Sequence, residues 1–198
     1  MSHQTLYRSS SLMMITAAIL LILGGILALV LPDGGLSSPA APLAYYLGLI
    51  VSVFASAGLF WVQASRMSRL GFAGLLMAVA GAVIYSGPAF VLAAGTLGVS
   101  TWHDVWGFAM GNVLLLGPTL FFLGLIFLGI ATRKAGVFAR WIGISLTTGG
   151  AIWLVAFFSG LPFTLTIGSL ATGVGLLAAG IALVSGKAVV QLSVQPAA

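Results

Sequence analysis

Residues 12–31 read LMMITAAILLILGGILALVL, a run of 20 residues that contains no charged side chain. A helix of about 20 apolar residues is long enough to cross the hydrocarbon core of a bilayer, which is about 30 Å thick. The apolar part of a cleaved signal peptide is shorter, roughly 7–15 residues. We therefore interpret this run as a retained first transmembrane helix, and a cleaved signal stays an alternative because small residues follow around Ser38.

The composition of the whole chain agrees with this interpretation. Of its 198 residues, 61% are hydrophobic and only 5% are charged, whereas a typical soluble domain is roughly 25% charged. So few polar side chains cannot cover a globule in water. We therefore expect the lipid bilayer to surround most of the chain.

Five further apolar runs follow the first, and turn-forming or basic residues separate them. They predict an all-α fold, a single transmembrane domain over 1–198 built as a polytopic bundle of six helices. The expected helices are 12–31, 43–62, 70–86, 105–130, 141–158 and 165–184.

One stretch departs from this regular pattern, the outer segment 87–104 between the third and fourth expected helices. It opens with Gly87-Pro88, a strong turn signal. The uncharged residues 89–99 that follow are too few to cross a bilayer. The sequence leaves three alternatives for them: a re-entrant segment, an interfacial segment or a kinked extension of the third helix.

The charged residues are divided between the two sides of the predicted bundle. All seven Lys and Arg residues fall on one side, and the two acidic residues, Asp33 and Asp104, fall on the other. Because basic loops stay in the cytoplasm, we expect both termini to be cytoplasmic in a cell membrane. The cations are scattered between helices and form no stripe, so the net charge of +5 does not indicate a nucleic-acid partner.

Small residues recur at helical spacing on the expected helices. Such residues let membrane helices approach closely, and close packing drives the association of helices in lipid. These positions either join the helices of the bundle itself or receive a partner protein or a second copy. The predicted helix-packing residues are Gly48, Ser52, Gly74, Ala78, Gly107, Gly111, Ala171 and Gly175.

Three polar residues are candidates for a site at the outer face. His103 and Asp104 begin the fourth expected helix, and Asn112 lies eight residues after Asp104, on the same helix face. The segment 101–104, Thr-Trp-His-Asp, also matches a capping box, so a helix-capping role competes with ligand binding. For Asn112, the simpler role is a hydrogen bond between helices. We expect Pro118 to kink this helix.

Several classes of chemistry lack the residues that they need. The chain has no cysteine, and the predicted topology puts its two histidines, His3 and His103, on opposite sides of the membrane. We therefore predict no metal site, no catalytic residue and no cofactor. No expected helix carries an ionisable residue at its middle, which argues against ion-coupled transport.

The last third of the chain has a recognisable order of features. A basic loop at 133–140 leads into Ala139-Arg140-Trp141-Ile142-Gly143, then a Gly-rich helix, a turn with Pro162 and a final Gly-rich helix. This order resembles small bacterial six-helix integral membrane proteins of unknown function. The resemblance implies a bacterial cytoplasmic membrane and carries over no catalytic residues.

Two functions follow from the sequence as hypotheses. The first is a non-enzymatic accessory or structural subunit of a membrane assembly, which the many small-residue faces and short loops favour. The alternative is a binder or carrier of a small hydrophobic molecule such as a lipid, a quinone or a pigment. The face shared by Asp104 and Asn112, the proline at 118 and the irregular segment 87–104 favour that alternative.

Overall fold

The structure is a computed structural model that describes the backbone of residues 3–31, 40–96, 103–159 and 162–186, and the side chains of 5–31, 40–87, 115–159 and 166–186. These ranges contain six α-helices and no strand, which confirms the predicted all-α class. The short 3₁₀ helix η2 (Ala64–Arg66) follows the second of them. The α-helices are α1 (His3–Val30), α2 (Ala40–Val62), α3 (Arg69–Thr96), α4 (His103–Ala135), α5 (Arg140–Ser159) and α6 (Pro162–Val184).

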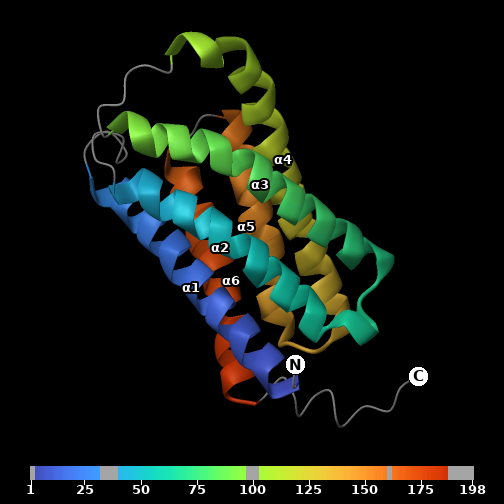
Figure 1. The fold of residues 1–198 in the computed structure, drawn as a ribbon. Coiled ribbons are helices and arrows are strands. Elements are labelled where there is room, and N and C mark those ends of the chain that lie inside the picture. Colours follow the sequence, from blue (N-terminus) through green and yellow to red (C-terminus); the bar gives the residue numbers. More distant parts are fainter. Residues whose placement is uncertain (1–2, 32–39, 97–102, 160–161, 187–198) are drawn as a thin grey trace.

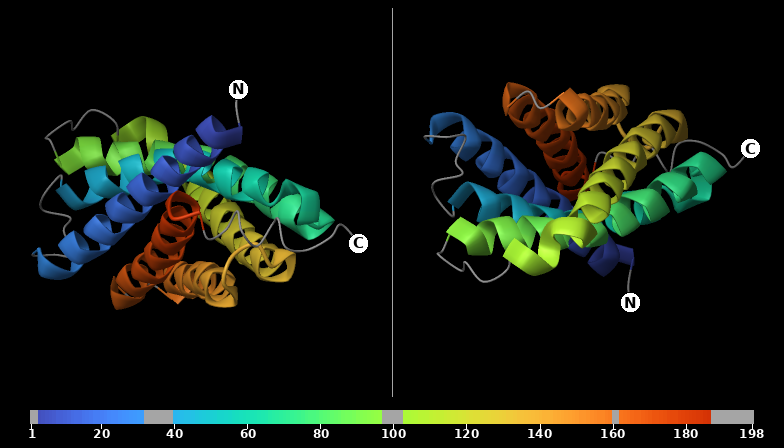
Figure 2. Two further views of the ribbon diagram at one scale, coloured as in Figure 1. Left: turned by 90° about the horizontal axis from the view of Figure 1, so that it is seen from below. Right: turned by 90° about the horizontal axis from the view of Figure 1, so that it is seen from above.

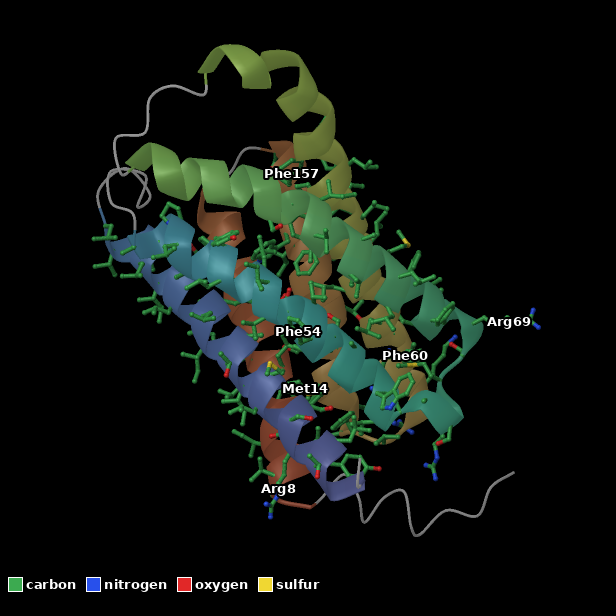
Figure 3. All side chains as sticks on the ribbon, viewed as in Figure 1. Arg8, Met14, Phe54, Phe60, Arg69 and Phe157 are labelled. Carbon is green, nitrogen blue, oxygen red and sulfur yellow. The ribbon has the colours of Figure 1, made fainter. Side chains whose placement is uncertain are left out.

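The six helices form a closed ring (Figures 1 and 2). Each packs against its neighbours in the sequence, and α6 returns to pack against α1. Successive helices run in opposite directions because the connections between them are short. The start of α1, the α2–α3 and α4–α5 connections and the end of α6 therefore lie at one end of the bundle, which we call the basic end. Figure 3 shows Arg8 and Arg69 there.

The helix boundaries extend beyond the expected apolar runs. Helix α3 continues through Gly87 and Pro88 to Thr96, so residues 89–96 extend the third helix, one of the three alternatives above. A proline in a membrane helix removes one backbone hydrogen bond, and the turns around it can hold the helix together. Helix α1 likewise begins at His3 rather than residue 12, because apolar content marks the membrane-crossing part and not the helix end.

Helix α4 is the longest element and bends. Its 33 residues make it about 50 Å long at 1.5 Å per residue, well beyond a hydrocarbon core of about 30 Å. Pro118 lies inside it, and Figure 1 shows the first part of α4 turning over the top of the ring. A proline ring disturbs the turn that precedes it, so we expect Pro118 to kink the helix there.

The side chains are distributed as in a protein that lipid surrounds. Every helix has apolar side chains that are about half exposed, such as Ile19, Phe54 and Ile181. The interior contains buried Ser and Thr residues beside Phe121 and Phe122. All six helices include a stretch that is long and apolar enough to cross a membrane. The chain is a multi-pass membrane protein.

Helices α3 and α4 form the closest helix–helix interface of the ring, which we call the α3–α4 seam. A Cβ atom added at Gly74 would lie 2.7 Å from the backbone nitrogen of Leu128, so only glycine permits this approach. The same relation repeats along both antiparallel helices. The facing pairs are Gly74 with Leu128, Ala78 with Gly124, Gly81 with Phe121, and Tyr85 with Gly117.

Candidate functional site

The interior of the bundle contains an aromatic cluster, formed by Tyr45, Tyr85, Phe121, Phe122, Trp153 and Phe157. Trp153 on α5 contacts three of the other rings and is only 4% exposed. Its ring centroid lies 4.8 Å from that of Phe122 and 6.1 Å from that of Tyr45, both in edge-to-face geometry. Figure 3 shows Phe157 at the end of the bundle away from Arg8, so the cluster occupies the half opposite the basic end.

Helix α6 supplies polar groups around this cluster. The Ser169 hydroxyl hydrogen-bonds the Tyr45 hydroxyl at 3.3 Å, and the Thr166 hydroxyl donates to the carbonyl of Gly25 on α1 at 3.3 Å. A hydrogen bond between membrane helices typically contributes about 1 kcal/mol. These bonds tie α6 to α1 and α2 beside the aromatic side chains.

A second polar contact crosses the ring nearer the basic end. The Gln63 amide nitrogen donates to the Leu59 carbonyl at 2.9 Å and to the Thr132 hydroxyl of α4 at 3.2 Å. Gln63 and Thr132 are both buried. The contact joins the end of α2 to the end of α4, which are not neighbours in the ring.

Three buried polar atoms have no hydrogen-bond partner among the described residues. They are the Gln63 Oε1, the Trp153 Nε1–H and the Thr172 Oγ1. A buried polar group without a partner is unfavourable by about 1–3 kcal/mol. Of the three, the Trp153 N–H edge of the indole ring lies against α6, because a Cβ added at Gly168 would meet its Cδ1 and Nε1 atoms.

A cleft of about 340 Å³ lies between α4 and α5 toward the basic end. Two cations on α4, Arg133 and Lys134, line it and are exposed. The cleft adjoins a close crossing of the two helices, where a Cβ at Gly143 would lie 2.8 Å from the backbone nitrogen of Arg133. Its lining residues are Ile130, Arg133, Lys134, Ile144, Thr147 and Thr148.

The predicted outer-face residues lie on the first part of α4. His103 is its first residue, Asp104 lies in its first turn, and Asn112 lies before Pro118. Their side chains fall outside the described residues, and so does the predicted cap residue Thr101. Ligand binding and helix capping therefore both stay predictions for these residues.

The structure describes the surroundings of several small residues that the sequence predicts to pack. These residues lie between helices of this chain. On α2, Gly48 faces Leu21 of α1, and Ser52 is buried and donates to the Leu49 carbonyl at 2.7 Å. Gly74 and Ala78 face α4 in the seam described above.

The remaining predicted packing residues lie on α6 and α4. Gly175 faces Leu146 of α5, and the Ala171 carbonyl accepts a hydrogen bond from Ser145 of α5 at 2.6 Å. Gly107 and Gly111 lie on the first part of α4, where side chains and their contacts are outside the described residues. Gly48, Gly74, Ala78 and Gly175 each lie against another helix of the same chain.

The sequence analysis did not select Gln63 or Trp153. Gln63 ends an apolar run, where a polar side chain usually meets water, so nothing in the sequence marks it as buried. Trp153 offered a signal, because it lies in the middle of a predicted helix, whereas tryptophan prefers the membrane interface. Within the described part of the chain, no group of three His, Asp or Glu residues is placed to hold a metal ion.

Comparisons of the chain with protein-family models, with curated proteins and with solved structures find no match. The resemblance of residues 133–184 to bacterial six-helix membrane proteins therefore stays a prediction. The candidate sites depend on two features of the described structure: the interior aromatic cluster with its unpaired indole N–H, and the basic cleft between α4 and α5.

Proposed function

We propose that this chain is a non-enzymatic accessory or structural subunit of a membrane assembly. The observation that supports this is the occupied interior. Glycine contacts join neighbouring helices at backbone distance, and the aromatic cluster fills the centre of one half of the ring. The close-packing faces of these helices contact one another. The outer surface of the bundle therefore remains for contact with another protein.

The α2–α3 side is the surface best suited to a partner protein. The glycines of α2 face α1, and those of α3 that meet another helix face α4, so no described glycine draws α2 and α3 together. These two helices meet instead through the Phe60 and Phe72 rings, 6.0 Å apart. Trp61 and Phe72 are 61% and 52% exposed, and exposed aromatic residues are typical of protein interfaces.

Native mass spectrometry of the protein, purified from its own membranes in mild detergent, tests this proposal. We expect another membrane protein to co-purify at fixed stoichiometry. The double variant Trp61→Leu/Phe72→Leu should release it, whereas Trp141→Leu/Phe158→Leu, which removes two exposed aromatic rings of α5, should not. A chain that carries no protein partner would contradict the subunit role.

The carrier of a small hydrophobic molecule is a second candidate function. The Trp153 N–H supports it, because this buried donor has no hydrogen-bond partner among the described residues and lies where α5 meets Gly168 of α6. A flat apolar molecule with a carbonyl oxygen, such as a quinone, would match such surroundings. The same mass spectra distinguish the two functions, because a carrier should retain a small molecule at fixed stoichiometry in the absence of any partner protein.

We propose that both termini face the cytoplasm of a cell membrane. The support is the gathering of the described cations at the basic end and the retention of basic segments in the cytoplasm. Since the chain has no cysteine, single cysteines can report the orientation. With an impermeant thiol reagent on intact cells, Ser37→Cys should react and Ser68→Cys should react only after permeabilisation. The reverse pattern would overturn the orientation.

A further inference from the structure

We propose that the cleft between α4 and α5 binds the headgroup of an anionic phospholipid. Arg133 and Lys134 place two positive charges in its wall, and the part of the chain whose side chains the structure describes contains no Asp or Glu that could pair with them. A phosphodiester supplies the complementary negative charge. Arginine binds phosphate through two parallel N–H groups, and lysine acts as a point charge.

The cleft presents different chemistry at two depths. Gly143 lies level with Arg133, and Gly129 lies level with Thr147, because a Cβ at Gly129 would be 2.7 Å from the Thr147 backbone nitrogen. Thr147 and Thr148 therefore lie about one helical turn, roughly 5 Å, deeper in the membrane than Arg133. The cations lie nearer the membrane surface and the hydroxyl groups lie deeper. This order matches a phospholipid, in which the ester oxygens lie deeper in the membrane than the phosphate.

The hydroxyls and the apolar lining complete the match. Thr147 donates to the Gly143 carbonyl at 2.8 Å, which fixes its side chain against the backbone of α5. Thr148 is exposed in the cleft and can donate to an ester oxygen. Ile130 and Ile144 contribute apolar walls for the first carbons of the acyl chains. A free phosphate ion would use the cations alone, whereas a phospholipid also uses the deeper hydroxyl and the apolar walls.

Competition between two lipids tests the proposal. The purified full-length protein is equilibrated with equal amounts of phosphatidylglycerol and phosphatidylcholine that carry the same acyl chains, and the retained lipids are counted by native mass spectrometry. We expect wild type to prefer phosphatidylglycerol. Since each cation near a membrane surface contributes about fivefold to anionic lipid binding, Arg133→Gln/Lys134→Gln should lower that preference about 25-fold.

Two control variants make the result specific to the cleft. Arg8→Gln/Arg69→Gln removes the same charge from the same end of the bundle, at exposed positions of α1 and α3, and should change the preference less than twofold. Ile144→Trp should block the cleft sterically while both cations remain. Ile181→Trp, at a similarly exposed position of α6, should leave lipid binding in the cleft unchanged.

Three outcomes would overturn the proposal. Equal retention of the two lipids by wild type would show that the cleft does not recognise the charge of the headgroup. An equal loss in both charge variants would show a general electrostatic effect. Displacement of the lipid by excess inorganic phosphate would show that free phosphate is the ligand. If Arg133→Gln/Lys134→Gln fails to fold, as judged by thermal unfolding, the proposal is tested by comparing the lipid retained by Ile144→Trp with that retained by Ile181→Trp.

Discussion

Replacement of Gly124 by alanine is expected to destabilise the protein by about 3 kcal/mol or more, at or above the usual range for overpacking a core. The new Cβ would lie 2.6 Å from the Cα of Ala78 and closer still to its backbone nitrogen. Backbone atoms of a helix cannot rotate aside as side chains can, so α3 and α4 would have to separate. Gly81→Ala should act alike, because its Cβ would meet the backbone of Phe121.

Gly87→Ala provides the matched control for these two variants. Gly87 lies in α3, and an added Cβ would meet no atom within 4 Å apart from its chain neighbours. Alanine favours the helix over glycine by up to about 1 kcal/mol, whereas the ring of Pro88 disfavours a Cβ at the residue before it, so this variant should lose far less stability than Gly124→Ala. Thermal unfolding in detergent, followed by tryptophan fluorescence, measures all three. Equal melting temperatures for Gly124→Ala and Gly87→Ala would contradict the α3–α4 seam.

The second large effect is expected from Trp153→Ala, which removes a ring that contacts three others in the aromatic cluster. Truncating a buried tryptophan to alanine costs about 3–5 kcal/mol, since the cavity loses contacts on every side. Trp153 contacts side chains of α2 and α4, among them Tyr45 and Phe122, so the loss should loosen several helices. Trp61→Ala, at a position that is 61% exposed, should change the stability of the purified protein by less than about 1 kcal/mol.

Trp153→Phe separates packing from hydrogen bonding at the same position. Most of the ring volume remains, and the indole N–H that is lost has no partner among the described residues. We therefore expect a loss of only about 1 kcal/mol. A large loss in the phenylalanine variant would show that the N–H has a hydrogen-bond partner in the folded protein. If the chain is a carrier, this variant should also fold normally and lose its small molecule.

The candidate site shows where sequence reasoning stops in a membrane protein. His103, Asp104 and Asn112 stand out in the sequence because polar residues are rare in apolar surroundings. The interior aromatic cluster and the α4–α5 cleft are built mostly from residue types that also face lipid. In a soluble protein, an apolar face marks the inside of a helix. Here Phe54 is 57% exposed and Phe122 is fully buried, and their residue type does not distinguish them.

The six apolar stretches and the Lys and Arg residues between them are enough to predict a bundle of six membrane helices with its basic residues at one end. Apolar length and charge are properties of each segment alone, so both can be counted without knowing any neighbour. Three features required the three-dimensional structure: α6 closes the ring against α1, α3 and α4 share the closest seam, and Arg133 and Lys134 share a cleft with Thr148. These pairings depend on how the shape of one helix face matches another, because lipid surrounds apolar faces as readily as a neighbouring helix does.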